Sequence, residues 1–276
     1  MNFALWRRAW HDVRVILPCC ASLLFVFNWL FVWLSNKVDL SALDFFLQML
    51  PKEWQQISAV PMTAIATPAG RIALAYIDPV VIGTYAVWAI GRGSDAVSGQ
   101  LGRGTLEMVV AQPVRRSAVL LTPVLVTTLG TAVLTLATWL GTCAGLATVT
   151  LSGDAQVAPA VFVPAALNLF AFGFFLAAIT TLVSSCDRFR GRTIGIVSGV
   201  YIVSLVIKIV ARTAKELEWL IYFTFFAPVE PQLFVARPEE AWSLSLRYDG
   251  ALLGLGLAAY LLATIIFSRR DLPAPI

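Results

Sequence analysis

The sequence predicts an all-α polytopic membrane protein with six transmembrane helices, and three observations support this prediction. First, 59% of the 276 residues are hydrophobic and only 13% are charged, whereas a soluble domain carries about 25% charged residues. Second, the mean hydropathy is +0.81. Third, the apolar residues gather in six long runs, as membrane-spanning helices require. These features exclude a soluble globular protein.

The six apolar runs lie near residues 15–34, 72–90, 117–147, 157–183, 193–211 and 250–268. The hydrocarbon core holds no water, so the backbone must satisfy its own hydrogen bonds and each run is expected to be a helix. Their continuous apolarity excludes the alternating pattern of a barrel strand. No connecting segment resembles an independent soluble unit, so residues 1–276 are expected to form one transmembrane domain.

The segment 3–14 precedes the first run and predicts a short amphipathic helix on the membrane surface. Trp6 and Trp10 are four residues apart and the arginines lie elsewhere, which suits an interfacial helix. The alternative is an ordinary flanking tail with interfacial tryptophans. The run 15–34 lacks a small-residue cleavage site, so we expect a retained helix rather than a signal peptide.

The distribution of Lys and Arg predicts the orientation. The N-terminal segment, the segment 91–116, the loop 187–192 and the C-terminal tail hold twelve of the twenty cations and five of the sixteen acids. Cytoplasmic loops of membrane proteins carry the excess of positive charge. We therefore expect a multi-pass protein of the cell (inner, cytoplasmic) membrane with both termini in the cytoplasm, which agrees with an even number of spans.

Two larger segments are assigned to the opposite side. Residues 36–71 contain an amphipathic stretch expected at the outer interface. Residues 213–247 are aromatic and interrupted by prolines. For the second segment we expect a short helix that enters the bilayer partway and is followed by a loop.

Asp78 is the candidate functional residue within the spans. It lies near the start of the second run and is followed by Pro79. An acid inside a membrane span is by default a functional hypothesis. The alternatives are that Asp78 lies near the outer headgroups or that it caps a kinked helix start.

The sequence predicts no catalytic residue, no metal site, no nucleotide-binding motif and no nucleic-acid partner. The single histidine and the four cysteines do not show ligand spacing. The spans contain neither a His/Asp/Glu cluster nor paired acids, which argues against an intramembrane hydrolase and against a proton-driven carrier.

Pairs of glycines four residues apart occur three times, at Gly141 and Gly145, Gly195 and Gly199, and Gly250 and Gly254. Small residues at this spacing let two helices approach closely. We expect them to serve packing within the chain, with a seam between two subunits as the alternative.

The segment between the second and third runs predicts a short helix outside the bilayer. Residues 91–104 are polar and glycine-rich, and Thr105 is a candidate N-cap. Leu106 and Val109 have helical spacing, and Pro113 disfavours helix at the residue before it. A short helix is unstable alone, so we expect a partner to dock against it. The alternative is a helix lying on the inner leaflet.

The stretch from Gly99 to Arg116 resembles the signature of the ABC-2 family, the membrane subunits of one class of ATP-binding-cassette transporters. It matches the family pattern at Gly99, Gly104, Thr105, Leu106, Glu107, Ala111, Pro113, Val114 and Arg116. It departs at Gln100, where the family has Glu, and at Arg115, where the family has Ser. The six-span order and the N-terminal surface helix are also similar to the family.

This resemblance implies a permease subunit that has no ATPase activity of its own and exports a substrate. Its implied partners are a cytoplasmic ABC ATPase, which binds ATP and Mg²⁺, a second membrane subunit in a homodimer or heterodimer, and membrane lipids. The short helix would be the coupling helix that enters a groove of the ATPase. The residues implied in this coupling are Gly104, Thr105, Leu106, Glu107, Met108, Val109, Pro113 and Arg116.

A second function from another class is also compatible with this resemblance. An ABC-2-like subunit can use ATP-driven motion to assemble or mature an extracytoplasmic partner protein without moving a solute. A solute path needs a cavity between subunits, whereas a mechanical device does not.

Overall fold

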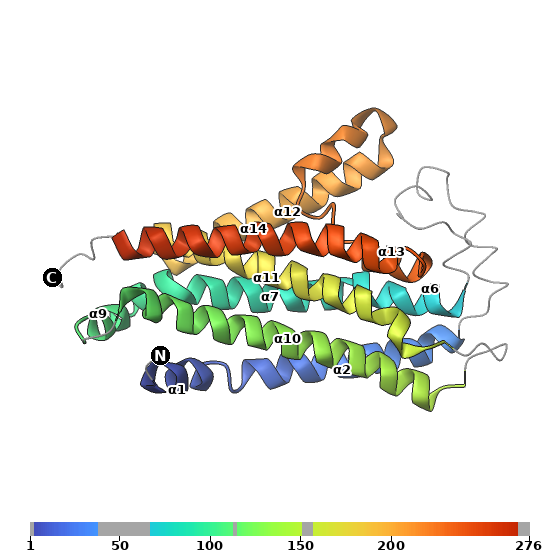
Figure 1. Cartoon of the computed structure of the whole chain (residues 1–276), viewed down its shortest axis with the longest axis horizontal. Coiled ribbons are helices and arrows are strands. Elements are labelled where there is room, and N and C mark those ends of the chain that lie inside the picture. The colour runs from blue at the N-terminus through green and yellow to red at the C-terminus, as the bar shows by residue number, and fades with distance from the viewer. Residues whose placement is uncertain (1–2, 38–66, 113–114, 151–156, 270–276) are drawn as a thin grey trace.

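The structure is a computed structural model that describes residues 3–37, 67–112, 115–150 and 157–269, apart from the side chains of Glu107, Val110 and Lys215. Within these residues six helical segments are long and apolar enough to cross a membrane, which confirms the predicted number. The helices form an elongated bundle (Figure 1). The amphipathic stretch predicted within 36–71 lies almost entirely outside the described residues.

Each crossing segment contains one of the predicted runs almost completely. The crossing segments are α2 (Ile16–Lys37), the segment Pro68–Gly102, α10 (Arg116–Thr148), the segment Pro159–Cys186, α12 (Arg190–Thr213) and α14 (Ala241–Arg269). The segment Pro68–Gly102 consists of α6 (Pro68–Ala73), the 3₁₀ turn η1 (Leu74–Ile77), α7 (Pro79–Ser94), η2 (Asp95–Gly99) and α8 (Gln100–Gly102). The segment Pro159–Cys186 consists of the 3₁₀ turn η3 (Pro159–Phe162) and α11 (Val163–Cys186).

The elements at the two ends of the bundle agree with the predicted sidedness. The N-terminal helix α1 (Phe3–His11), the short helix α9 (Thr105–Val110) and the last turns of α14 lie at one end (Figure 1). The opposite end holds α6 and α13 (Pro231–Ala236) (Figure 1). We call these the α9 end and the α13 end. The predicted N-terminal helix is confirmed as α1, in which Trp6 and Trp10 pack edge to face with ring centroids 6.4 Å apart.

Helix α11 is central and α12 is peripheral. Sixteen of the 24 residues of α11 are buried, and it packs against α14 and α7. Only four of the 24 residues of α12 are buried, and α12 diverges from the other helices (Figure 1). The other described residues therefore leave most of the surface of α12 uncovered.

Helices α7 and α10 are joined by aromatic side chains that bond to a row of threonines. Trp88 of α7 is fully buried, and its Nε1 donates to the hydroxyl of Thr131 (3.2 Å) and to the carbonyl of Thr127 (3.3 Å). The Tyr85 hydroxyl donates to Thr135 (3.1 Å). The threonines recur every four residues, so they share one face of α10. This seam satisfies polar groups where water is absent.

Gly130 makes room for the Trp88 ring. A Cβ atom at position 130 would overlap the ring carbons of Trp88. We expect Gly130→Ala to destabilise the protein by about 1–3 kcal/mol through overpacking, measured by thermal unfolding in detergent. Gly254→Ala is the control, because a Cβ there meets nothing within 4 Å. Equal stability of the two variants would contradict this packing.

The glycine pairs have different surroundings. A Cβ at Gly141 or Gly145 would collide with Phe25 or Val32 of α2, so this pair serves packing within the chain, as predicted. A Cβ at Gly195 or Gly199 on α12, or at either member of the α14 pair, meets nothing within 4 Å. For these two pairs the described residues do not supply the expected packing within the chain.

Asp78 lies at the junction of η1 and α7. Its Oδ1 accepts a hydrogen bond from the backbone N–H of Val80 (2.8 Å), and Pro79 occupies the first turn of α7. Asp78 therefore caps a helix start, which is one of the alternatives considered above.

The segment before α14 contains short helices and a buried ion cluster. It comprises the 3₁₀ helix η4 (Lys215–Phe223) and α13. Glu230, which is 2% exposed, pairs with Lys208 (2.8 Å) and Arg212 (3.1 Å) of α12. Lys208 thus binds a carboxylate of its own chain. This cluster holds the segment before α14 against α12.

Candidate functional site

The candidate site is the α9 end, where the second crossing segment leaves the bundle. The sequence predicted that the second span ends near residue 90, before the polar, glycine-rich residues 91–104. That prediction is wrong: the segment stays helical to Gly102, through the last turn of α7, the π-helical turn η2 and α8. Small polar residues are compatible with a buried helix when a neighbouring helix supplies hydrogen-bond partners.

Ser184 of α11 supplies those partners to the π-helical turn. A π-turn disturbs the regular i to i−4 ladder of backbone hydrogen bonds. The Ser184 hydroxyl accepts from the backbone N–H groups of Val97 (3.3 Å) and Ser98 (2.9 Å) and donates to the carbonyl of Ser94 (3.1 Å). The hydroxyls of Ser98 and Thr193 are 3.2 Å apart, which brings α12 into the same network.

Asp95 joins three elements at this end of the bundle. It accepts two hydrogen bonds from Arg103, at 2.7 and 3.1 Å. Its Oδ1 also lies 3.6 Å from Nη1 of Arg190, the first residue of α12. Because it donates to Asp95, Arg103 has a pKa raised above its ordinary value. The carboxylate therefore ties the turn between α8 and α9 to the start of α12.

The turn from α8 into α9 depends on Gly104. Its φ is +66°, a left-handed conformation that glycine adopts without steric cost. The backbone N–H of Gly104 donates to the carbonyl of Leu101 (3.0 Å). The sequence suggested Thr105 as the N-cap; instead, Thr105 is the first residue of α9, and its hydroxyl donates to the carbonyl of Gln100 (3.2 Å).

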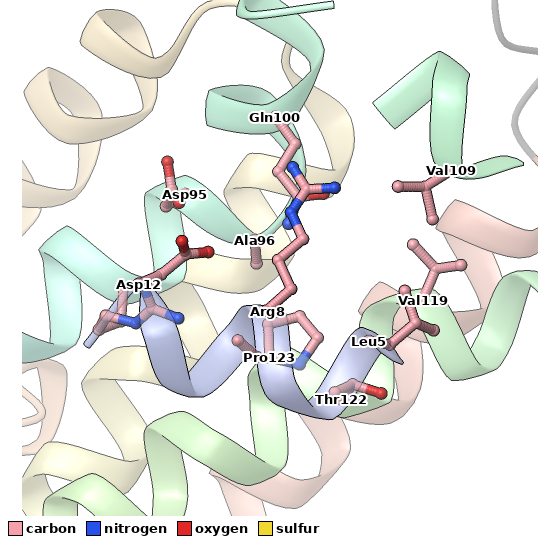
Figure 2. A pocket seen from close by; sticks show the side chains of 12 residues that line it. Leu5, Arg8, Asp12, Asp95, Ala96, Gln100, Val109, Val119, Thr122 and Pro123 are labelled. Atoms are coloured by element: carbon pink, nitrogen blue, oxygen red, sulfur yellow. The ribbon is translucent and has the colours of Figure 1, made fainter. Parts of the chain in front are cut away.

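Helix α9 has an inner and an outer side. Leu106 is fully buried and Val109 is 9% exposed, whereas Met108 is 65% exposed. Val109 faces Val119 of α10 (Figure 2). Leu106 and Val109 therefore anchor α9 to the bundle, and Met108 is the residue of these three that is available to a partner.

Three other residues were predicted to take part in coupling, and the structure describes only some of them. Arg116 is exposed and begins α10, just after the connection from α9. The side chain of Glu107 and the whole of Pro113 lie outside the described part of the chain.

The turn between α11 and α12 is held by Asp187. Its Oδ1 accepts from the backbone N–H groups of Arg188 (2.6 Å) and Phe189 (3.2 Å), and Oδ2 accepts from Nε of Arg192 (2.6 Å). Burial would raise the pKa of the Asp187 carboxyl, but these hydrogen bonds outweigh it and keep the pKa below its ordinary range. These contacts fix the turn that leads into α12.

Two hollows lie between α1 and the end of α7. The smaller one is lined by residues of α1, the α7 extension, α9 and α10, and within it Arg8 extends from α1 toward Gln100 (Figure 2). The larger one is a groove of about 650 Å³ lined by Arg8, Arg92, Arg103 and Arg190 together with Asp12 and Asp95. Sequence reasoning did not identify this gathering, because its members come from four separate segments.

Asp249 is a buried acid that lies just before the predicted sixth run, 250–268. Helix α14 begins at Ala241, nine residues before the predicted start of the span. Asp249 accepts from Asn168 Nδ2 (2.6 Å) of α11 and from the Ser245 hydroxyl (2.5 Å). These partners let the carboxyl group lie inside the bundle, and the serine four residues earlier was the available sequence signal.

The fold and the α9 end define a polytopic α-helical membrane protein with a short helix displayed between its second and third spans. Residues 19–272 match the family described as ABC-2 family transporter protein. The chain therefore belongs to the ABC-2 family and is a membrane permease component of an ABC transporter, distinct from the ATPase. Comparison with curated proteins gives no match.

Substitutions can distinguish the buried side of α9 from its exposed side. We expect Leu106→Ala to destabilise the α9 end by about 2–5 kcal/mol, because it leaves a cavity in the core. Met108→Ala should change stability by no more than about 0.5 kcal/mol, as is usual for surface positions. Hydrogen exchange of the α9 amides, together with thermal unfolding, measures both. A larger effect at Met108 than at Leu106 would reverse the assignment.

Proposed function

We propose that this chain is the transmembrane subunit of an exporter and that α9 is its coupling helix. A separate cytoplasmic ATPase, which itself binds ATP and Mg²⁺, would dock on the outer side of α9. The observation that carries the proposal is the two-sidedness of α9: Leu106 and Val109 are buried in the bundle, while Met108 is exposed. A helix that is anchored to the bundle on one side and exposed on the other can transmit the motion of a docked partner to the bundle.

The contacts around α9 determine which helices would move when the ATPase displaces it. Two ATPase subunits that close on ATP would bring two coupling helices together. Displacement of α9 acts on α7 through the helical extension that ends at Gly102. It acts on α12 through Arg103, Asp95 and Arg190. Because helices transmit displacement along their length, the spans would rock and alter access to a path between subunits.

A second membrane subunit is part of the proposal. Helix α12 has twenty of its 24 residues incompletely buried, and Gly195 and Gly199 on it are uncovered by the described residues. Small residues four apart favour close contact between helices in a membrane. We therefore propose that α12 contributes to the contact with the second subunit.

Met108→Asp should weaken association with the ATPase about tenfold or more. Burying a methionine side chain contributes about 1.5–3 kcal/mol, and each 1.4 kcal/mol is a factor of ten. The readout is the amount of Walker-motif ATPase, with its vanadate-sensitive activity, that co-purifies with the tagged chain from native membranes. Phe3→Asp is the control, because Phe3 is also exposed (79%) at the α9 end but lies on α1. Equal recovery with both variants would refute the docking assignment.

The orientation is tested with a cysteine at position 108 in a chain whose four native cysteines are replaced. We expect an impermeant maleimide to label Met108→Cys only after the membrane is opened, because the ATPase and α9 share the cytoplasm. Labelling in intact cells would place α9 outside and contradict the orientation.

A further inference from the structure

The groove beside α1 carries an excess of positive charge. Four arginines line it (Arg8, Arg92, Arg103 and Arg190), against the two acids Asp12 and Asp95. Two positive charges are therefore in excess along a groove of about 650 Å³. Concave sites lined by one sign of charge concentrate ions of the opposite sign.

Arg92 is the exceptional member of this set. It is 9% exposed, and its Nε is buried without a hydrogen-bond acceptor among the described residues. It lines both the groove and the smaller hollow next to it. A buried N–H donor without an acceptor is costly, so the unpaired Nε of Arg92 points to an anionic group that completes the site.

Asp95, one of the two acids in the groove, is already engaged. Both oxygens of Asp95 accept from Arg103, and Arg190 lies 3.6 Å from Oδ1. Asp12 and Asp95 attract Arg92 electrostatically, but neither offers it a hydrogen bond. Arginine presents a planar fork that matches the oxygens of a phosphate or carboxylate.

The same groove continues into an apolar part. It is lined by Val15, Ile16 and Cys19 at the start of α2. Val15 is 67% exposed and Ile16 is 40% exposed, so this side is open toward the space around α2. A ligand with an anionic head and a hydrocarbon tail fits both parts, whereas a small inorganic anion uses only the first.

We propose that this groove binds an anionic amphiphile of the leaflet at the α9 end, with its phosphate-type headgroup on Arg92. The headgroup lies close to Arg8, Arg103 and Arg190, and the tail follows the start of α2. This inference does not depend on the direction of transport. Because Arg103 and Arg190 also hold Asp95, a bound headgroup competes with the contact that fixes the turn before α9.

Cys19 lies in the groove, is exposed, and reports on its occupancy. The test uses the full chain with Cys20, Cys143 and Cys186 replaced by Ala, purified in a neutral detergent, and follows alkylation of Cys19 by a maleimide. Short-chain phosphatidic acid at about four times its Kd should slow alkylation about fivefold, because only the empty protein reacts. Diacylglycerol with the same chains and inorganic phosphate at the same concentration should leave the rate unchanged.

Substitutions identify the anchoring residue. Arg92→Gln should abolish the protection by phosphatidic acid, and Arg92→Lys should retain part of it. Arg7→Gln is the matched control, because Arg7 is exposed on α1 and does not line the groove. If Arg92→Gln fails to fold, Arg8→Gln takes its place and should weaken the protection. No protection of the parent chain, protection that survives Arg92→Gln in folded protein, or equal protection by inorganic phosphate would overturn the proposal.

Discussion

The lack of water in the hydrocarbon is the constraint on which the rest of this structure depends. A polar group inside the bundle must find its partner on another helix or on its own backbone. The threonine row of α10 meets this requirement for Trp88 and Tyr85, and Ser184 meets it for the π-helical turn. These hydrogen bonds set the register of α7 against both of its neighbours, and through α7 they set where the chain emerges at the α9 end.

The α9 end is built from contacts between segments that are distant in sequence. Asp95 holds Arg103, in the turn before α9, together with Arg190 at the start of α12. Leu106 and Val109 fix the inner side of α9 to the bundle. A partner that moves α9 therefore acts on helices from both halves of the chain, although it contacts a single short segment.

The sequence predicted the spans and the position of the short helix, because apolar length and proline placement are local signals. It ended the second span near residue 90, although the helical segment continues to Gly102. The reason is that small polar residues give the same sequence pattern whether they face water or a serine on another helix. It placed Asp249 outside the sixth span for a similar reason: Asn168, which accommodates the carboxyl group, is 81 residues away. The inner and outer sides of α9 were not distinguishable, because the apolar residues of a six-residue helix do not indicate which side meets the bundle.

The π-helical turn η2 has a consequence for how α8 is presented. A π-turn contains one residue more than an α-helical path between the same points, and one residue corresponds to a rotation of about 100°. This extra residue therefore determines the direction in which the side chains of Gln100 to Gly102 point around the helix axis. The number of residues in the π-turn therefore selects which side of α8 faces outward, as much as the chemistry of those residues does.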